Sequence, residues 1–348
     1  MPLPFILIAG AVAAAAAGIG SGINGGKKMK EANDTMKVAE SRHHSNIQRF
    51  ERKQEATTAD MDRLGKLELE ILNSFTKFSD IFERIQNRPE FKKYDRENVE
   101  IPAYNKEELK RASVGAGVLL GGLGGAVAGT AGGFAAAGAT TAAVMALGTA
   151  STGTAIASLS GAAATNATLA ALGGGALGST FWAGGMSLGS AVLGGATLGV
   201  GLLVGGLIFN ATGKKLSDKA DEAWSQMKRA EKEINTICDY LNDLSQAEKK
   251  FENALKRVNQ VYCRHLNMMG DLVILRGKTN WNEFAPSEQA LTENTVLLVG
   301  LLYEMCKVKL VKQSTKKDEV NKVNDSEINN AVKKADTFLN ERGLSGLA

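Results

Sequence analysis

Three histidines and three cysteines are the side chains of this sequence best suited to metal binding or nucleophilic chemistry. His43 and His44 are adjacent, so a helix would point them in different directions, whereas two ligands of one metal on a helix are typically four residues apart. The run Cys263, Arg264 and His265 combines a thiol with an imidazole, but near neighbours on a helix also diverge. These residues predict neither a metal site nor a thiol nucleophile.

Glycine-rich motifs that cradle nucleotide phosphates are not found in the sequence. Residues 210–215 read NATGKK and lack the first glycine of a phosphate-binding loop. GxGxxG-like matches between Gly115 and Gly122 lie inside an apolar run and do not follow a strand. Because no Ser/His/Asp or carboxylate pair is recognisable either, the sequence predicts no cofactor and a protein that is not an enzyme.

The composition excludes further classes of protein. The net charge of +4 is spread over mixed-charge stretches, which argues against a nucleic-acid partner. Cys238, Cys263 and Cys306 form no CxxC pair and lie in apolar helical settings, so we expect buried free thiols in a reducing compartment. Glycine reaches 39 residues against five prolines and clusters in the centre of the chain, which is not the profile of an ordinary enzyme.

The stretch from Ala112 to Gly213 contains no Lys, Arg, Asp, Glu or His. Because ~20 apolar residues suffice for one helix to cross a bilayer, we expect a long Gly/Ala-rich transmembrane helical hairpin segment here. Two or four crossings fit its length, with breaks around Ser151 to Gly153 and Gly173 to Thr180, where Gly, Ser and Thr concentrate. The partner expected from this stretch is a lipid bilayer.

Small residues recur at every fourth position in this stretch, and they would give a helix a flat face for close packing. The two series are Gly117, Gly121, Gly125, Gly129 and Gly133, then Ala183, Ser187, Ala191, Gly195 and Gly199. Two such faces predict a helical hairpin, a homo-oligomer, or both.

A second uncharged stretch of spanning length runs from Pro4 to Ile23. It fits a cleaved secretory signal, a helix buried in the protein, or a retained membrane helix. The membrane helix is favoured because the small residues Gly10, Ala14, Gly18 and Gly22 repeat the four-residue period of the central segment.

Basic residues border both apolar stretches and indicate their orientation. These residues are Lys27, Lys28 and Lys30, then Lys110 and Arg111, and finally Lys214 and Lys215. If the positive-inside rule applies, all three clusters face the cytoplasm and the central segment crosses an even number of times. We therefore expect an integral membrane protein with its helices facing the cytoplasm; the alternative is a secreted soluble form that inserts into a target membrane.

Apolar residues advance in steps of three and four from Ala32 to Ile85 and from Leu216 to His265, which predicts two long helices with coiled-coil seams. The first seam comprises Ile47, Phe50, Met61, Leu64, Ile71, Phe75 and Phe78, and the second Ile234, Ile237, Leu241, Leu244, Phe251, Leu255 and Val258. Polar residues interrupt the heptads at His43, Gln54, Thr57 and Glu68, and Glu248 occupies a position of the second stripe. Neither helix can bury its stripe alone, so we expect antiparallel pairing of the two.

The remainder of the chain predicts shorter helices. Gly270 to Phe284 breaks the second long helix, and Leu272 to Leu275 fits either a short strand or a packed loop. Ser287 and Ser326 are the expected caps of the last two helices, of which the first continues through an apolar run and the second covers Glu327 to Glu341. The expected domains are residues 1–26, 27–111, 112–213, 214–270 and 271–348.

The predicted fold is all-α, an elongated antiparallel helical bundle that carries the apolar hairpin. This order of long helix, uncharged segment, long helix and shorter helices resembles α-helical pore-forming toxins of the cytolysin A and tripartite enterotoxin type. The resemblance covers Ala32 to Val311 at the level of architecture, matches no motif residue, and transfers no functional residue. Because the apolar run is longer than the usual tongue and a second one precedes the first helix, the sequence suggests a constitutively embedded protein or a pore with several spans.

Two functions follow as hypotheses. The first is a membrane-inserting protein that oligomerises through glycine-zipper helices to form a pore or permeabilise a bilayer. The second is a membrane-anchored coiled-coil scaffold or accessory subunit that recruits a cytoplasmic protein partner, for example in bacterial defence or membrane remodelling.

Overall fold

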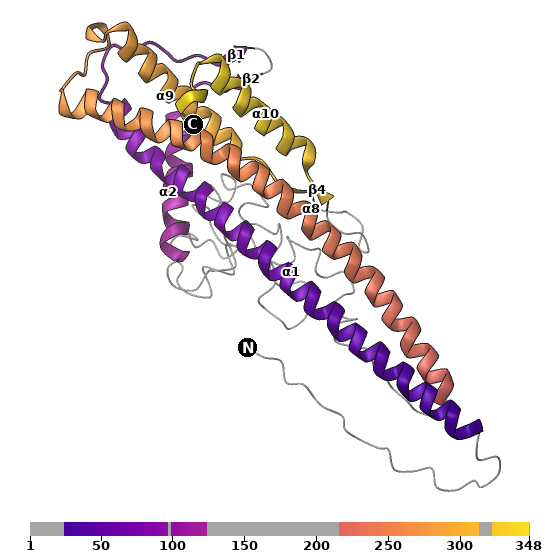
Figure 1. Cartoon of the computed structure of the whole chain (residues 1–348). Helices are drawn as coiled ribbons and strands as arrows, with labels where there is room; N and C mark the ends of the chain where they lie inside the picture. The colour runs from indigo at the N-terminus through magenta and orange to yellow at the C-terminus, as the bar shows by residue number, and fades with distance from the viewer. Residues whose placement is uncertain (1–23, 97–98, 124–215, 313–321, 348) are drawn as a thin grey trace.

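The computed structural model describes residues 24–96, 99–123, 216–312 and 322–347, which form a mainly helical bundle. Two helices dominate it: α1 (Asn24–Phe82, 59 residues) and α8 (Leu216–Gly270, 55 residues). At ~1.5 Å per residue they are roughly 90 and 80 Å long. They lie side by side along the whole molecule (Figure 1). The prediction of two long packed helices is therefore confirmed.

The two long helices run in the same direction. Cross-helix contacts join Arg42 to Glu231 at 2.9 Å, Arg63 to Glu252 at 3.2 Å, and Lys77 to Asn267 at 3.4 Å. Because residue numbers rise together along both helices, α1 and α8 are parallel, and both begin at the same end (Figure 1).

Antiparallel packing occurs between other neighbours. Helix α2 (Lys106–Leu123) runs back along the end of α1, with Lys106 bound to Glu83 and Ser113 bound to Thr76. Helix α9 (Pro286–Met305) runs back along α8. The sequence predicted antiparallel pairing of the two long helices with each other, and this is corrected. The reason is that α2 reverses the chain before α8 begins, and heptad spacing is the same in either direction.

Three more elements complete the bundle. Helix α10 (Asp325–Glu341) packs on α8 and runs parallel to it, with Lys250 bound to Asn329 and Arg257 to Asp336. Two antiparallel ribbons pair β1 (Tyr94–Arg96) with β2 (Val99–Ile101) and β3 (Val311–Lys312) with β4 (Lys322–Val323). Single helical turns, η2 (Asp271–Leu275), η3 (Trp281–Glu283) and η4 (Ser345–Leu347), complete the described elements.

Several local predictions are corrected at the helix ends. Leu272 to Leu275 form neither a strand nor a loop but a π-helical turn that continues α8. The cap of α9 is Ala285 rather than Ser287, because the Glu288 carboxylate accepts a hydrogen bond from the Ala285 backbone N–H at 2.8 Å. Asn324, not Ser326, precedes α10 as its cap residue.

The described residues divide into a stalk and a head. The contiguous apolar core begins at Met61 on α1 and Ile237 on α8 and includes buried residues of α2, α9 and α10. We call this part the head, and residues 24–60 with 216–236 the stalk. In the stalk the buried residues of α1 are small or polar, and the larger seam residues Ile47 and Phe50 are only partly buried. The head therefore holds most of the hydrophobic stabilisation.

Among the described residues, no helix combines the length and apolarity needed to cross a membrane. The uncharged stretch itself begins inside the bundle, because α2 starts at Lys106 and continues past Ala112. Ala112, Ser113 and Ala116 are buried against α1. Small side chains here serve the close approach of α2 to α1.

Candidate functional site

The seam between α1 and α8 brings most of the expected seam residues together. Met61, Leu64, Ile71, Phe75 and Phe78 are at most 2% exposed on α1. Their counterparts on α8, which are Ile234, Ile237, Leu241, Leu244, Phe251, Leu255 and Val258, are at most 4% exposed. Ile47 and Phe50 are only partly buried, because the stalk has no third helix over them among the described residues.

The predicted membrane-packing residues lie outside the described residues, with two exceptions on α2. Those outside are Gly10, Ala14, Gly18, Gly22, Gly125, Gly129, Gly133, Ala183, Ser187, Ala191, Gly195 and Gly199, together with the expected breaks at 151–153 and 173–180. Gly117 and Gly121 belong to α2. A Cβ atom at Gly117 would lie 2.9 Å from Asn73 Oδ1 on α1, so this glycine packs within the bundle.

The Ser113 hydroxyl anchors α2 to the backbone of α1. It accepts a hydrogen bond from the Thr76 backbone N–H at 3.1 Å and donates one to the Asn73 carbonyl at 2.9 Å. The Thr76 hydroxyl lies 2.6 Å from the same oxygen. Polar contacts and small residues therefore hold α2 in place, in addition to the buried Leu109.

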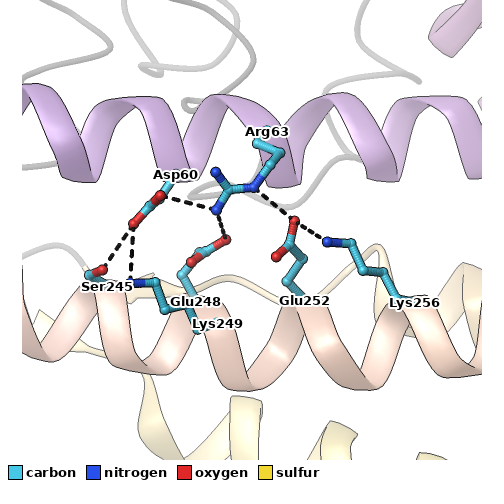
Figure 2. Close-up of polar contacts among 7 residues, drawn as sticks. All are labelled: Asp60, Arg63, Ser245, Glu248, Lys249, Glu252 and Lys256. Atoms are coloured by element: carbon cyan, nitrogen blue, oxygen red, sulfur yellow. Dashed lines mark hydrogen bonds and ion pairs between the residues drawn. The ribbon is translucent and has the colours of Figure 1, made fainter.

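A cluster of charged residues lies where the stalk meets the head, and it is the candidate functional site. Arg63 of α1 reaches across to α8 and contacts three carboxylates (Figure 2). Its guanidinium is 3.0 Å from Asp60, 3.2 Å from Glu252 and 3.9 Å from Glu248. Heptad spacing places Glu248 at a core position of α8, and Asp60, Arg63 and Glu252 lie beside the heptad stripes.

Two lysines and a serine complete the cluster. Lys256 lies 3.0 Å from Glu252, and Lys249 lies 3.8 Å from Asp60 (Figure 2). The Ser245 hydroxyl donates a hydrogen bond to Asp60 at 3.0 Å. The charges are nominally balanced, but they are not equally buried. The side chains of the three cations are 46–60% exposed, whereas those of Glu248 and Glu252 are 0% and 6% exposed.

The Glu248 carboxyl group is therefore excluded from water, and its protein neighbours replace the lost hydration only weakly. Neither of its oxygens has a hydrogen-bond partner among the described residues. Burial, together with the neighbouring carboxylates of Glu252 and Asp60, raises the pKa of Glu248 to about 7 against the opposing effects of Arg63 and Lys249. This group changes its charge near neutral pH.

Glu68 is a second buried carboxyl group, located deeper in the head. Its side chain is fully buried, and neither oxygen has a hydrogen-bond partner among the described residues. Burial raises the pKa of Glu68 well above its ordinary value. The Cys306 thiol, just after α9, lies 3.9 Å from the backbone oxygen of Glu68, and burial raises the pKa of this thiol as well.

The positions of these two acids could be predicted in part from the sequence. Glu68 and Glu248 occupy positions of the heptad stripes, where they are recognised from the sequence only as polar interruptions of an apolar pattern. What the sequence could not show is that both side chains are excluded from water, since that depends on α9 and on the direction of α8. Arg63 and Glu252 lie beside the heptad stripes, and nothing in the sequence pattern marked them as members of a functional site.

The other residues considered for chemistry do not converge. His43 is buried and His44 is exposed with its ring bound to Gln48. Cys263 is exposed, whereas His265 is buried with its Nδ1 2.9 Å from the Val261 carbonyl. No group of His, Cys, Asp and Glu side chains suited to a metal ion occurs in the part of the chain that the structure describes. The chemistry available to the acidic cluster is proton binding.

The chain matches no protein-family model, no curated protein and no solved structure. The resemblance to α-helical pore-forming toxins consequently remains one of architecture, namely a bundle of long packed helices.

Proposed function

We propose that this chain is a membrane-inserting helical protein that permeabilises a bilayer. The α1–α8 pair serves as a stalk, and the two apolar stretches of the sequence enter the lipid. Self-association through the small-residue faces then builds a homo-oligomer, because close helix approach in lipid is favoured by residues such as Gly129 and Gly133.

The observation that supports this proposal is the parallel direction of α1 and α8. Residues 1–23 directly precede α1, and the uncharged stretch directly precedes α8. Both helices begin at the same end of the bundle (Figure 1), so the C-terminal end of each apolar stretch meets the bundle there. Lys30 lies there on α1, where basic residues would face lipid headgroups on the aqueous side.

The uncharged stretch must also connect the end of α2 in the head to the start of α8 at the other end of the bundle. It leaves the described bundle at Leu123, past the contact of Gly117 with Asn73 in the head, and returns at Leu216. The separation of Asn73 from the start of α1 at Asn24 corresponds to roughly 75 Å of helix. The 92 residues 124–215, uncharged except for Lys214 and Lys215, exceed what this connection requires, which leaves enough of them for two membrane crossings.

The test is dye release from liposomes by the purified full-length protein. Gly129→Leu with Gly133→Leu fills one small-residue face outside α2, and we expect it to reduce release at least about tenfold, because ~1–2 kcal/mol per close contact shifts an oligomer equilibrium by that factor. The matched control is Ala131→Leu with Ala135→Leu, which adds one carbon less per site, on the opposite helix face, and should leave release near wild type.

Two results would contradict the proposal. One is the absence of release by the wild-type protein at any protein-to-lipid ratio at which it binds the vesicles. The other is equal release by the glycine variant, the alanine variant and the wild type, which would rule out a pore packed through these glycines.

A membrane-anchored scaffold is the second candidate, and it is favoured by the apolar side chains exposed near the far end of the head. Leu275, Ile274 and Met268 are 79%, 51% and 50% exposed. Nearby, a cavity of about 370 Å³ is lined in part by Phe91 and Trp281. A purified partner that binds one-to-one, and whose binding is lost on Leu275→Asp but kept on Val38→Asp in the stalk, would support this function instead.

A further inference from the structure

We propose that Glu68 and Glu248 form a proton-operated lock on the α1–α8 seam, which is closed when both carboxyl groups are protonated and loosened when they ionise. Both side chains are 0% exposed, and their oxygens lack hydrogen-bond partners among the described residues. A neutral carboxyl group can occupy such a site, whereas an ionised one must give up its hydration without compensation.

The groups that face Glu248 favour its neutral form. From α1 it faces Asp60 and Arg63, and from α8 the carboxylate of Glu252. Among the described residues, the cation within ion-pair distance is Arg63, which is 3.9 Å away and is shared with the other two carboxylates (Figure 2). Asp60 and Glu252 each have a lysine as well, so an ionised Glu248 would be the carboxylate with the weakest ion pair in the cluster.

The elements on the other side of α8 do not supply a cation to Glu248. Helix α10 contributes Asp336, which binds Arg257, and Asn329, which binds Lys250. Lys249, the neighbour of Glu248 on α8, forms an ion pair with Asp60 and opposes the rise in the pKa of Glu248.

The surroundings of Glu68 are still less polar. From α9 the titratable group beside it is the Cys306 thiol, which is itself fully buried. No ion pair of Glu68 occurs among the described residues, and Leu64, Leu72 and Leu302 belong to the same buried core. Glu68 thus responds to pH through burial, and Glu248 through burial and neighbouring charges.

The direction of the pH effect follows from proton linkage. Both carboxyl groups have a higher pKa in the folded protein than in the unfolded chain, so the folded state binds more protons once the pH exceeds about 4.5. Their contribution to stability is complete at acidic pH and is lost as the pH rises through the folded pKa, which for Glu248 is about 7. The seam is tight at acidic pH and loosens above neutrality.

The two acids are placed to control where the bundle opens. Glu248 lies at the boundary of stalk and head, and Glu68 lies against the end of α9. In its link to membrane activity, this inference rests on the proposed function, because a loosened seam would free the helices to rearrange during insertion. The lock itself is a property of the bundle and can be measured without lipid vesicles.

The test compares thermal unfolding of the full-length protein, in mild detergent, at pH 5.5 and pH 8.5. Glutamine reproduces the neutral carboxyl group, so we expect Glu248→Gln and Glu68→Gln to melt near or below wild type at pH 5.5. At pH 8.5 we expect each to melt about 3–6 °C above wild type, since the charged form is no longer buried. The double variant should gain more than either single one.

Glu70→Gln is the matched control, because Glu70 lies on α1 but is 54% exposed and pairs with Lys66. Its effect should be small and equal at both pH values. If Glu68→Gln and Glu248→Gln change the melting temperature by the same amount at pH 5.5 and pH 8.5, as this control does, the lock does not exist.

Dye release separates the lock from the proposed function. We expect wild-type release to be faster at pH 8.5 than at pH 5.5, and the double glutamine variant to be slow at both. If the melting temperatures behave as expected and no protein releases dye, the lock holds and the proposed function fails. If wild type releases dye but the melting differences are independent of pH, the proposed function holds and the lock fails.

Discussion

Arg63 is the cation that contacts all three carboxylates of the charged cluster on the α1–α8 seam. It reaches Asp60, Glu248 and Glu252 at once, while its own side chain is 51% exposed. A carboxylate that loses its cation keeps its desolvation penalty, so removing the cation costs more than the exposed ion pair itself would contribute. The effect must also depend on pH, because a protonated Glu248 no longer needs the guanidinium.

We therefore predict that Arg63→Gln lowers the free energy of unfolding by about 1–3 kcal/mol at pH 8.5 and by less at pH 5.5. Urea denaturation followed by circular dichroism would measure both values. Arg52→Gln is the control, because Arg52 is exposed on the same helix, and it should change stability little. An equal loss at both pH values would show that the guanidinium does not act through the buried acids.

At the scale of elements, the docking of α2 on α1 shows how glycine serves two purposes in this chain. The four-residue glycine period predicts close helix packing, and Gly117 is indeed closely opposed to another helix. That helix is α1 of the bundle, where Asn73 occupies the space that a side chain at this position would need. The four-residue period alone does not show whether the helix that packs against the glycines belongs to the bundle or to a membrane segment.

We predict that Gly117→Leu weakens this docking. The new side chain would displace Asn73 and strain the neighbouring hydrogen bonds of Ser113 to α1. Amide hydrogen exchange in peptides covering residues 106–117 should become at least about tenfold faster. Val114→Leu, at a 44% exposed position of the same helix, should leave the exchange unchanged. Equally slow exchange in both variants would mean that α2 tolerates the larger residue and is not closely packed.

The direction of the long helices is the feature of the fold that the sequence could not supply. Phe75 and Leu255 occupy heptad positions, and their burial follows from that pattern. The same pattern is satisfied by parallel and antiparallel pairs. Contacts such as that between Arg42 and Glu231 decide between them, and these depend on α2 reversing the chain, which its short mixed sequence did not indicate.

The candidate site was predictable to a similar extent. Glu68 and Glu248 are visible in the sequence as acids on apolar stripes, so their position on the inner helix face is predictable. Their isolation from water is not, because it requires Cys306 near one and Asp60 with Glu252 near the other. Side-chain burial in a bundle depends on which helices meet, and that is a property of the whole chain.

At the scale of the whole molecule, the two ends of the elongated bundle differ. The end where α1 and α8 begin adjoins the C-terminal end of each apolar stretch, and the opposite end carries the turn after α8 (Figure 1). Over the 55 residues of α8 the two ends are roughly 80 Å apart. A bilayer that meets the first end would leave the second end far out in water.

Energy transfer from a labelled cysteine to acceptor lipids in proteoliposomes tests this claim most directly. Donors are attached at Lys30→Cys on α1, Asp218→Cys on α8 and Leu275→Cys in the head, in a Cys263→Ser background because Cys263 is the exposed native thiol among the described residues. We predict strong transfer from the first two positions and little from the third. Strong transfer from position 275, or from only one of positions 30 and 218, would contradict a parallel stalk that stands on the membrane at its starting end.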